Sequence, residues 1–176
     1  MAQKILKAMQ RVHAILARRP QAGIRPDEPA TARWDEGTRV ITRHANGTQI
    51  LTDMPAELGG EGNQVSPGWL LRAGLASCLA TRIAMEAAAG GILLTRLEVI
   101  ARSTSDARGL LGMMDDHGEP VTPAPCELQL EVSIGASNVP HERLRAMIDA
   151  SFRCSPVSAA VERAVPVGLD VAIEAS

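Results

Sequence analysis

The chain has three cysteines, and two of them occur where a thiol could do chemistry. Cys78 interrupts the apolar run from Ser66 to Gly91. Cys154 directly precedes a Ser-Pro pair that starts a second helical pattern, so its sulfur would lie near backbone amide dipoles that favour a thiolate. Two such cysteines could carry thiol redox chemistry. The alternative is that Cys78 is simply a small core residue, since free cysteine is among the most buried residue types.

The other candidate ligands and nucleophiles favour no metal or hydrolase site. Cys126 opens an alternating stretch after Pro-Ala-Pro, and we interpret it as a packed residue because nothing near it stabilises a thiolate. The three cysteines show no paired spacing for zinc. The histidines lie in segments that give no reason to meet Cys78, which argues against a Cys-His hydrolase. These are His13, His44, His117 and His141.

One acidic loop could in principle bind a cation. It contains Asp115, Asp116, His117 and Glu119. Adjacent acids in a turn rich in Gly and Pro are usually solvated, so we do not interpret the loop as a metal site. The sequence therefore predicts no metal and no cofactor.

The run that contains Cys78 predicts one long helix. Ser66 can accept a hydrogen bond from a first-turn amide, and Pro67 suits the first helical position. Gly90 and Gly91 can supply the left-handed conformation that ends a helix. Large apolar residues cover most of its circumference, which predicts a buried helix with Cys78 in the core. They are Leu70, Leu71, Leu75, Leu79 and Ile83.

Residues 2–19 predict an amphipathic helix that Pro20 ends. One side carries Ile5, Met9, Val12 and Leu16, and the other Lys4, Lys7, Arg11 and Arg18. A targeting peptide or a membrane-surface helix would also fit, but targeting segments are usually rich in serine and this one has none. We expect it to pack on its own domain or on a dimer partner. Residues 1–28 are thus a helix and connector, and residues 29–176 one domain.

The remaining pattern predicts an α+β fold with two long helices against one antiparallel sheet. Asn46-Gly47, between two alternating runs, predicts a type I′ hairpin. The loop MPAELGGEGNQV lacks the lysine of a phosphate-binding motif and is interpreted as a flexible loop. Strands are expected at residues 29–34, on both sides of the hairpin turn, and at residues 93–102, 126–134 and 165–173. The second long helix is expected at residues 140–152.

Composition excludes several partners. The formal net charge is −2 and the basic residues are scattered, which argues against nucleic acid binding. No apolar run reaches the roughly 20 residues that a membrane helix needs. Three cysteines are too few for a disulfide scaffold and fit a reducing compartment, so we expect a cytoplasmic protein.

Three segments together resemble one family. They are LGGEGNQVSPGWLLRAGLASCLA, residues 58–80; STSDARGLLGM, residues 103–113; and RCSPVSAAVERAVPV, residues 153–167. In order and spacing they resemble the OsmC/Ohr family of thiol-dependent peroxidases, from about Thr31 to the end of the chain.

The resemblance implies an OsmC-like α+β fold, an intertwined homodimer and an antioxidant, stress-response role. It also implies that Cys78 is the peroxidatic cysteine and Cys154 the resolving one. The substrate would be an organic hydroperoxide, and an external dithiol would restore the thiols.

One position departs from the family pattern. The peroxidases carry a glutamate just after the proline that opens the helix, and it holds an arginine of the first strands against the thiolate; Gly68 stands here instead. The first strands offer Arg33, Arg39 and Arg43. Arg82, one turn after Cys78, could supply the charge, but pairing with Glu86 is the favoured interpretation. Gly68 therefore also favours an alternative function, a non-catalytic dimer that binds a small hydrophobic ligand.

Overall fold

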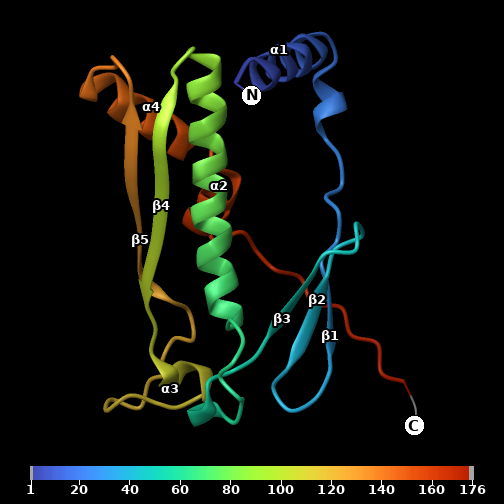
Figure 1. Ribbon diagram of the computed structural model, residues 1–176. Helices are drawn as coiled ribbons and strands as arrows, with labels where there is room; N and C mark the ends of the chain where they lie inside the picture. Colours follow the sequence, from blue (N-terminus) through green and yellow to red (C-terminus); the bar gives the residue numbers. More distant parts are fainter. Residues whose placement is uncertain (1, 175–176) are drawn as a thin grey trace.

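The central element is the long helix α2 (Pro67–Ala89), seen in a computed structural model that describes residues 2–174 (Figure 1). Met1, the first residue of the predicted segment 1–28, and residues 175–176, the last of the predicted domain 29–176, lie outside the described residues. The predicted N-cap is confirmed, since the Ser66 side chain accepts a hydrogen bond from the Trp69 amide at 3.2 Å. Of the two glycines at the other end, Gly91 takes the left-handed conformation, with φ +66°, whereas Gly90 has φ −81°.

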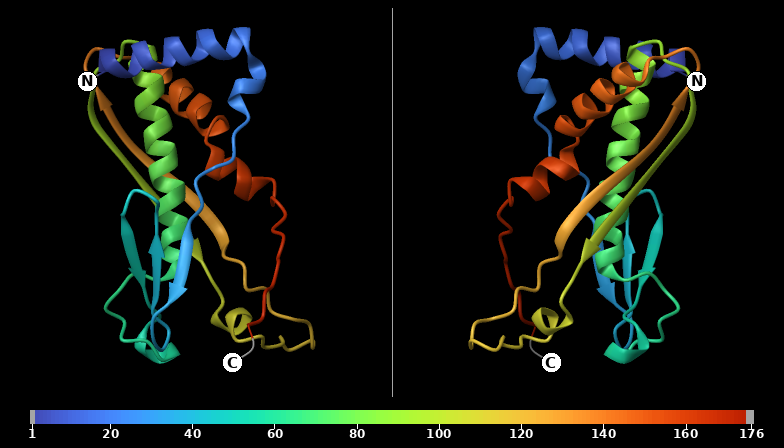
Figure 2. Two further views of the ribbon diagram at one scale, coloured as in Figure 1. Left: turned by 90° about the vertical axis from the view of Figure 1, so that its right-hand side faces the viewer. Right: turned by 90° about the vertical axis from the view of Figure 1, so that its left-hand side faces the viewer.

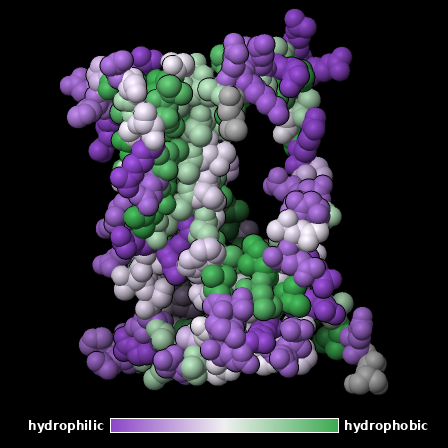
Figure 3. Space-filling model, viewed as in Figure 1, coloured by the Kyte–Doolittle hydropathy of each residue, from purple (hydrophilic) through white to green (hydrophobic). Residues whose placement is uncertain are grey.

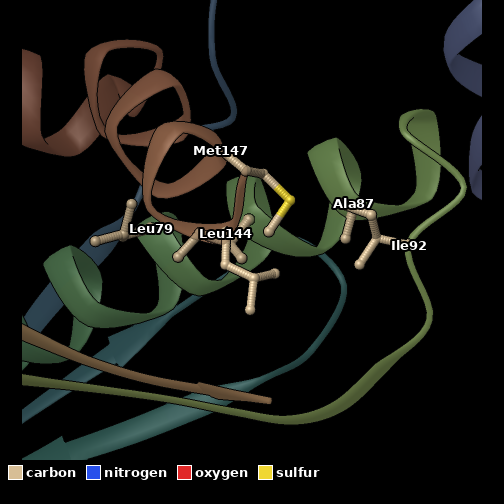
Figure 4. Close-up of a cluster of buried hydrophobic side chains, with 6 residues drawn as sticks. Leu79, Ala87, Ile92, Leu144 and Met147 are labelled. Carbon is tan, nitrogen blue, oxygen red and sulfur yellow. The ribbon is translucent and has the colours of Figure 1, made fainter. Parts of the chain in front are cut away.

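One stripe of α2 forms the hydrophobic core. Leu79, Ile83 and Ala87, spaced four residues apart on one face, pack with Ile92, Leu144 and Met147. Figure 4 shows Met147 and Leu144 of helix α4 (His141–Arg153) reaching toward α2. Each of the larger side chains contributes about 1.5 to 3 kcal/mol by leaving water. This packing fixes which face of α2 looks inward.

A two-stranded antiparallel sheet covers the same stripe. It consists of β4 (Leu94–Thr104) and β5 (Cys126–Ala136), with Val99 opposite Val132. The predicted alternation of β5 is confirmed, because partly buried residues alternate with exposed ones from Leu128 to Ile134. Of the partly buried residues, Leu130, Val132 and Ile134 pack against the core cluster. A short helix α3 (Ala107–Leu110), capped by Asp106, follows β4.

The first three strands form a separate antiparallel sheet. They are β1 (Thr31–Trp34), β2 (Val40–Arg43) and β3 (Gln49–Thr52), paired in sequence order. In Figures 1 and 2 this sheet lies beside the first half of α2, away from β4 and β5. The α+β class is confirmed, but the strands form two antiparallel sheets rather than one.

The hairpin between β2 and β3 is not a type I′ turn, so that prediction is wrong. The His44 amide donates to the Thr48 carbonyl and the Gly47 amide to the His44 carbonyl, which closes a three-residue loop. Gly47 takes positive φ, +92°, while Asn46 does not. The reason is that the Asn46 side chain accepts the Thr48 amide at 2.9 Å and so fixes a different loop.

The helix predicted at the N-terminus is present, whereas the strand predicted near the C-terminus is not. The predicted N-terminal helix is present as α1 (Ala2–Arg18), followed by a 3₁₀ turn, η1 (Pro20–Gly23), and it contacts α2. The strand predicted at residues 165–173 is absent from the described chain, which is irregular there. Val167 is 94% and Ile173 is 91% exposed. An alternating segment becomes a strand only when it pairs with another strand, and no strand of the described residues pairs with it.

No helix among residues 2–174 is long and apolar enough to cross a membrane.

Removing one side chain from the α2 stripe tests this account of the core. Ile83 is 0% exposed, so Ile83→Ala should leave a cavity and lower the free energy of unfolding by about 2 to 5 kcal/mol. Leu93→Ala, at a residue 71% exposed, is the control and should change it by less than about 0.5 kcal/mol. Urea unfolding followed by circular dichroism measures both, and similar losses for the two variants would contradict the assignment.

Candidate functional site

Cys78 lies at the edge of the buried face of α2 and not in the core, which corrects the sequence prediction. It is partly exposed, whereas its neighbour Leu79 is 1% exposed. Successive helix residues point about 100° apart, so a helix that turns Leu79 and Ile83 to the core turns Cys78 sideways. On that side it meets the connection between α4 and helix α5 (Pro156–Glu162).

The residue that contacts Cys78 is Ser155. The Ser155 hydroxyl donates a hydrogen bond to Cys78 Sγ at 3.3 Å, and the Ser158 hydroxyl donates to Ser155 Oγ at 3.1 Å. Ser155 is 0% and Ser158 3% exposed. Neither serine is predicted from the sequence as a site residue. The available signal was the spacing Ser-Pro-x-Ser at a helix start, which places both hydroxyls in one helical turn.

Cys154 immediately precedes Ser155 and is exposed. It follows the last residue of α4, where its amide donates to the Ser151 carbonyl at 3.2 Å. The structure therefore brings the Cys154–Ser155 turn to Cys78, with the serine of that pair in contact. The resolving role of Cys154 stays a prediction.

The arginines that the sequence offered for Cys78 either pair with acidic side chains or are exposed. Arg82 pairs with Glu86 at 3.2 Å, as favoured from the sequence. Arg39 lies 3.7 Å from both Glu36 and Asp53 and also pairs with Glu61. Arg33 and Arg43, on β1 and β2, are exposed.

Gly68 lies on the outside of the first turn of α2. A Cβ added there would lie 3.8 Å from Arg72 Nη1 and would meet no obstacle. Arg72 in turn donates to the Ser103 hydroxyl at 3.2 Å. A glutamate at position 68 would thus meet Arg72 of the same helix, four residues on.

Cys126 is exposed, which corrects its interpretation as a packed residue. Its sulfur donates to the Thr104 carbonyl at 3.4 Å. The β4–β5 register shifts between Arg102 and Thr104, and Glu127 takes a positive φ of 51°. These irregularities interrupt the alternation that would have turned Cys126 inward with Leu128.

The acidic loop is organised by its own backbone. Asp115 accepts hydrogen bonds from the amides of Glu119 and His117, and these hold the pKa of its carboxyl below its ordinary value. Across residues 2–174, no cluster of three or more His, Cys, Asp and Glu side chains is arranged to hold a metal ion.

An apolar cavity of about 420 Å³ lies beside Ser158. It lies between α2, β5, α4 and α5, and its polar rim includes Arg145, Asp149 and Glu162. The apolar lining includes Leu75, Leu79, Leu130, Ile148 and Phe152, with Ser158 beside them.

Comparison with known proteins agrees with this architecture. A family model described as OsmC-like protein matches residues 60–170. The chain belongs to the OsmC family. No curated protein matches its sequence.

Solved structures share the OsmC fold at low identity. An OsmC-like protein from Mycoplasma pneumoniae is 18% identical with a TM-score of 0.65, over 79% of this chain and 89% of that one. An OsmC-like protein of unknown function from Vibrio cholerae is 16% identical with a TM-score of 0.60, over 78% and 95%. An organic hydroperoxide resistance protein from Elizabethkingia anophelis is 19% identical with a TM-score of 0.56, over 79% and 90%.

In this OsmC family protein a buried carboxylate holds the loop before α2. Asp53, 2% exposed, accepts hydrogen bonds from the Thr38 hydroxyl at 2.5 Å and from the amides of Glu61 and Met54 at 2.9 and 2.8 Å. The bond from Thr38, followed by that from the Glu61 amide, lowers the pKa of Asp53, although burial of the carboxyl acts in the opposite direction.

The glycines of the same loop have a structural role. A Cβ at Gly60 would lie 1.8 Å from the Met54 carbonyl oxygen, and Gly59 has φ +83°. The loop packs against its own backbone and against Asp53, and its glycines are needed for that close packing and for the positive φ.

Asp53 makes the stability of this loop dependent on pH. A carboxyl whose pKa is lowered by folding stabilises the folded state above its unfolded pKa and loses that contribution as the pH falls below about 4. Asp53→Asn should therefore lower the urea midpoint at pH 7, and the gap to wild type should narrow at pH 3. The control is Glu57→Gln, at an exposed position of the same loop, which should match wild type at both pH values. A gap of equal size at pH 3 and pH 7 would contradict the role of the charge.

Proposed function

We propose that this protein is a thiol-dependent peroxidase that reduces organic hydroperoxides through Cys78. The observation that carries the proposal is the environment of its sulfur. Cys78 is partly exposed and receives a hydrogen bond from a buried hydroxyl on the turn that also carries Cys154. Membership of the OsmC family supports it, as does the fold shared with an organic hydroperoxide resistance protein.

The reaction would proceed in three steps. The Cys78 thiolate attacks the terminal oxygen of the hydroperoxide, the O–O bond breaks, and the leaving alkoxide takes a proton to become an alcohol. Cys78 is then a sulfenic acid. The Cys154 thiolate attacks that sulfur, an S–S bond forms, and hydroxide leaves and is protonated to water. An external dithiol reduces the disulfide by two thiol exchanges and is itself oxidised to a disulfide.

We further propose that the active form is a homodimer. The single chain leaves much apolar surface exposed along α2 and over the three-stranded sheet (Figure 3). Trp69 is 47% and Trp34 69% exposed, and the C-terminal segment exposes alternate apolar residues. A second copy could cover these surfaces and offer the strand edge that residues 165–173 lack. The free state of all three thiols fits the cytoplasm, which we propose as its location.

The apolar cavity favours a second candidate function, a non-catalytic dimer that binds a small hydrophobic ligand. A cavity of about 420 Å³ lined mainly by apolar side chains is within the usual range for small-molecule sites. Gly68 agrees with it, because no carboxylate stands at the start of α2. The two functions differ in whether Cys78 reacts.

Cysteine variants separate the two functions. Cys78→Ser should abolish hydroperoxide consumption with a dithiol donor. Cys154→Ser should prevent the Cys78–Cys154 disulfide after oxidant treatment and slow turnover with the dithiol. Cys126→Ser is the matched control and should keep the wild-type rate. Peroxide consumption and peptide mapping measure these outcomes. If Cys78 is unmodified after hydroperoxide treatment, the binding function is favoured and the peroxidase is not.

The C-terminal segment tests the homodimer. Wild type should have the mass of two chains by light scattering across a dilution series. Val171→Lys, in the exposed alternating row, should shift the mass toward one chain on dilution, because a charge would enter an apolar contact. Asp170→Asn changes the net charge by the same +1 at the neighbouring position, outside the row of apolar residues, and this variant should stay dimeric. A one-chain mass for wild type would contradict the proposal.

A further inference from the structure

The two buried serines beside Cys78 form a directed chain of hydrogen bonds. Ser158 donates to Ser155 at 3.1 Å, and Ser155 donates to the sulfur at 3.3 Å. In this arrangement each hydroxyl can direct its hydrogen toward Cys78. Hydrogen bonds in such a chain polarise one another, and the last donor becomes a stronger one. The chain therefore ends in a hydroxyl that suits a negatively charged acceptor.

Burial fixes this arrangement. Ser155 and Ser158 are 0% and 3% exposed, so water does not compete for their hydroxyls. The Ser155 amide donates to the Phe152 carbonyl at 3.0 Å, and the Ala159 amide donates back to the Ser155 carbonyl at 2.9 Å. Ser155 is held by backbone bonds on both sides, and its hydroxyl needs no rearrangement to meet the sulfur.

The charged groups on the elements around Cys78 have other partners or face solvent. On α2, Arg82 pairs with Glu86, and on α4, Arg145 pairs with Asp149. Arg153 at the end of α4 and Glu162 at the end of α5 are exposed. The polar group that contacts the sulfur is therefore a neutral hydroxyl.

We propose that Ser155 is the hydrogen-bond donor that stabilises the Cys78 thiolate and that Ser158 positions it. The proposal deepens the peroxidase function and rests on it for its biological meaning. A thiolate accepts a hydrogen bond more strongly than a thiol does, so the contact favours the charged, nucleophilic form. In the first step of the reaction the same hydroxyl would hold the sulfur while its lone pair attacks oxygen.

The neighbouring Ser151 provides a matched control. It is 0% exposed and lies four residues before Ser155, and its hydroxyl has no hydrogen-bond partner among the described residues. Ser151→Ala removes the same atom from the same buried region without touching the chain of hydroxyls. A difference between this variant and Ser155→Ala therefore reports the hydrogen bond to sulfur and not the loss of a buried hydroxyl.

The experiment measures the alkylation rate of Cys78 in the full-length protein as a function of pH. Iodoacetamide is the probe, and peptide mass spectrometry resolves Cys78 from the other two thiols. Ser155→Ala should lower the rate near neutral pH by about tenfold or more and move the half-maximal rate to higher pH, as expected for losing a hydrogen bond to a charged group. Ser158→Ala should act in the same direction by a smaller factor, and Ser151→Ala should follow wild type.

The outcomes separate this proposal from the peroxidase function. Superimposable pH profiles for Ser155→Ala, Ser151→Ala and wild type would overturn the role of Ser155. If Ser155→Ala does not fold by circular dichroism, Ser158→Ala decides, and a wild-type profile for it overturns the proposal. The alkylation assay needs no peroxide. A shifted profile in a protein that consumes no hydroperoxide would therefore support the serine chain while the peroxidase function fails.

Discussion

The fold of this chain depends on the burial of one stripe of α2. Leu79 and Ile83 are almost completely removed from water by β4, β5 and α4, and the four-residue spacing of the stripe sets the rotation of the whole helix. With the rotation set, Cys78 must emerge at the side of the stripe. Cys78 is thus placed by the packing of its neighbours, because its own side chain contributes little to the core.

The same packing brings the end of α4 to Cys78. Leu144 and Met147 anchor α4 on α2, and the chain then turns at Cys154 and starts α5 at Pro156. A turn between two packed helices has little conformational freedom. Which of two neighbouring residues, Cys154 or Ser155, points toward Cys78 therefore depends on where α4 ends. That residue is Ser155, whose hydroxyl contacts the sulfur, while the thiol of Cys154 belongs to an exposed residue. The chemistry at the sulfur is therefore determined by how α4 ends.

A second feature is the incomplete burial of the single chain. The three-stranded sheet precedes α2 and the C-terminal segment follows α5, and within residues 2–174 neither pairs with β4 or β5 (Figures 1 and 2). Apolar residues in both remain exposed, although the sequence there alternates as it does in a buried strand. Such surface is costly in water and fits an assembly of chains. The cavity beside Ser158 is lined by α2, β5, α4 and α5 of one chain.

The sequence by itself determined the long helices, the strands β4 and β5, the cap at Ser66 and the OsmC family, because caps, periodicity and motifs are local properties of the chain. It also indicated that Arg82 would pair with Glu86, four residues on in the same helix. Only the tertiary structure decided that Cys78 is partly exposed and that residues 165–173 find no strand edge. It also decided that Ser155 contacts the sulfur. Each of these features depends on how one element is rotated or placed against another. In the turn between α4 and α5, a shift of one residue would change which side chain contacts Cys78.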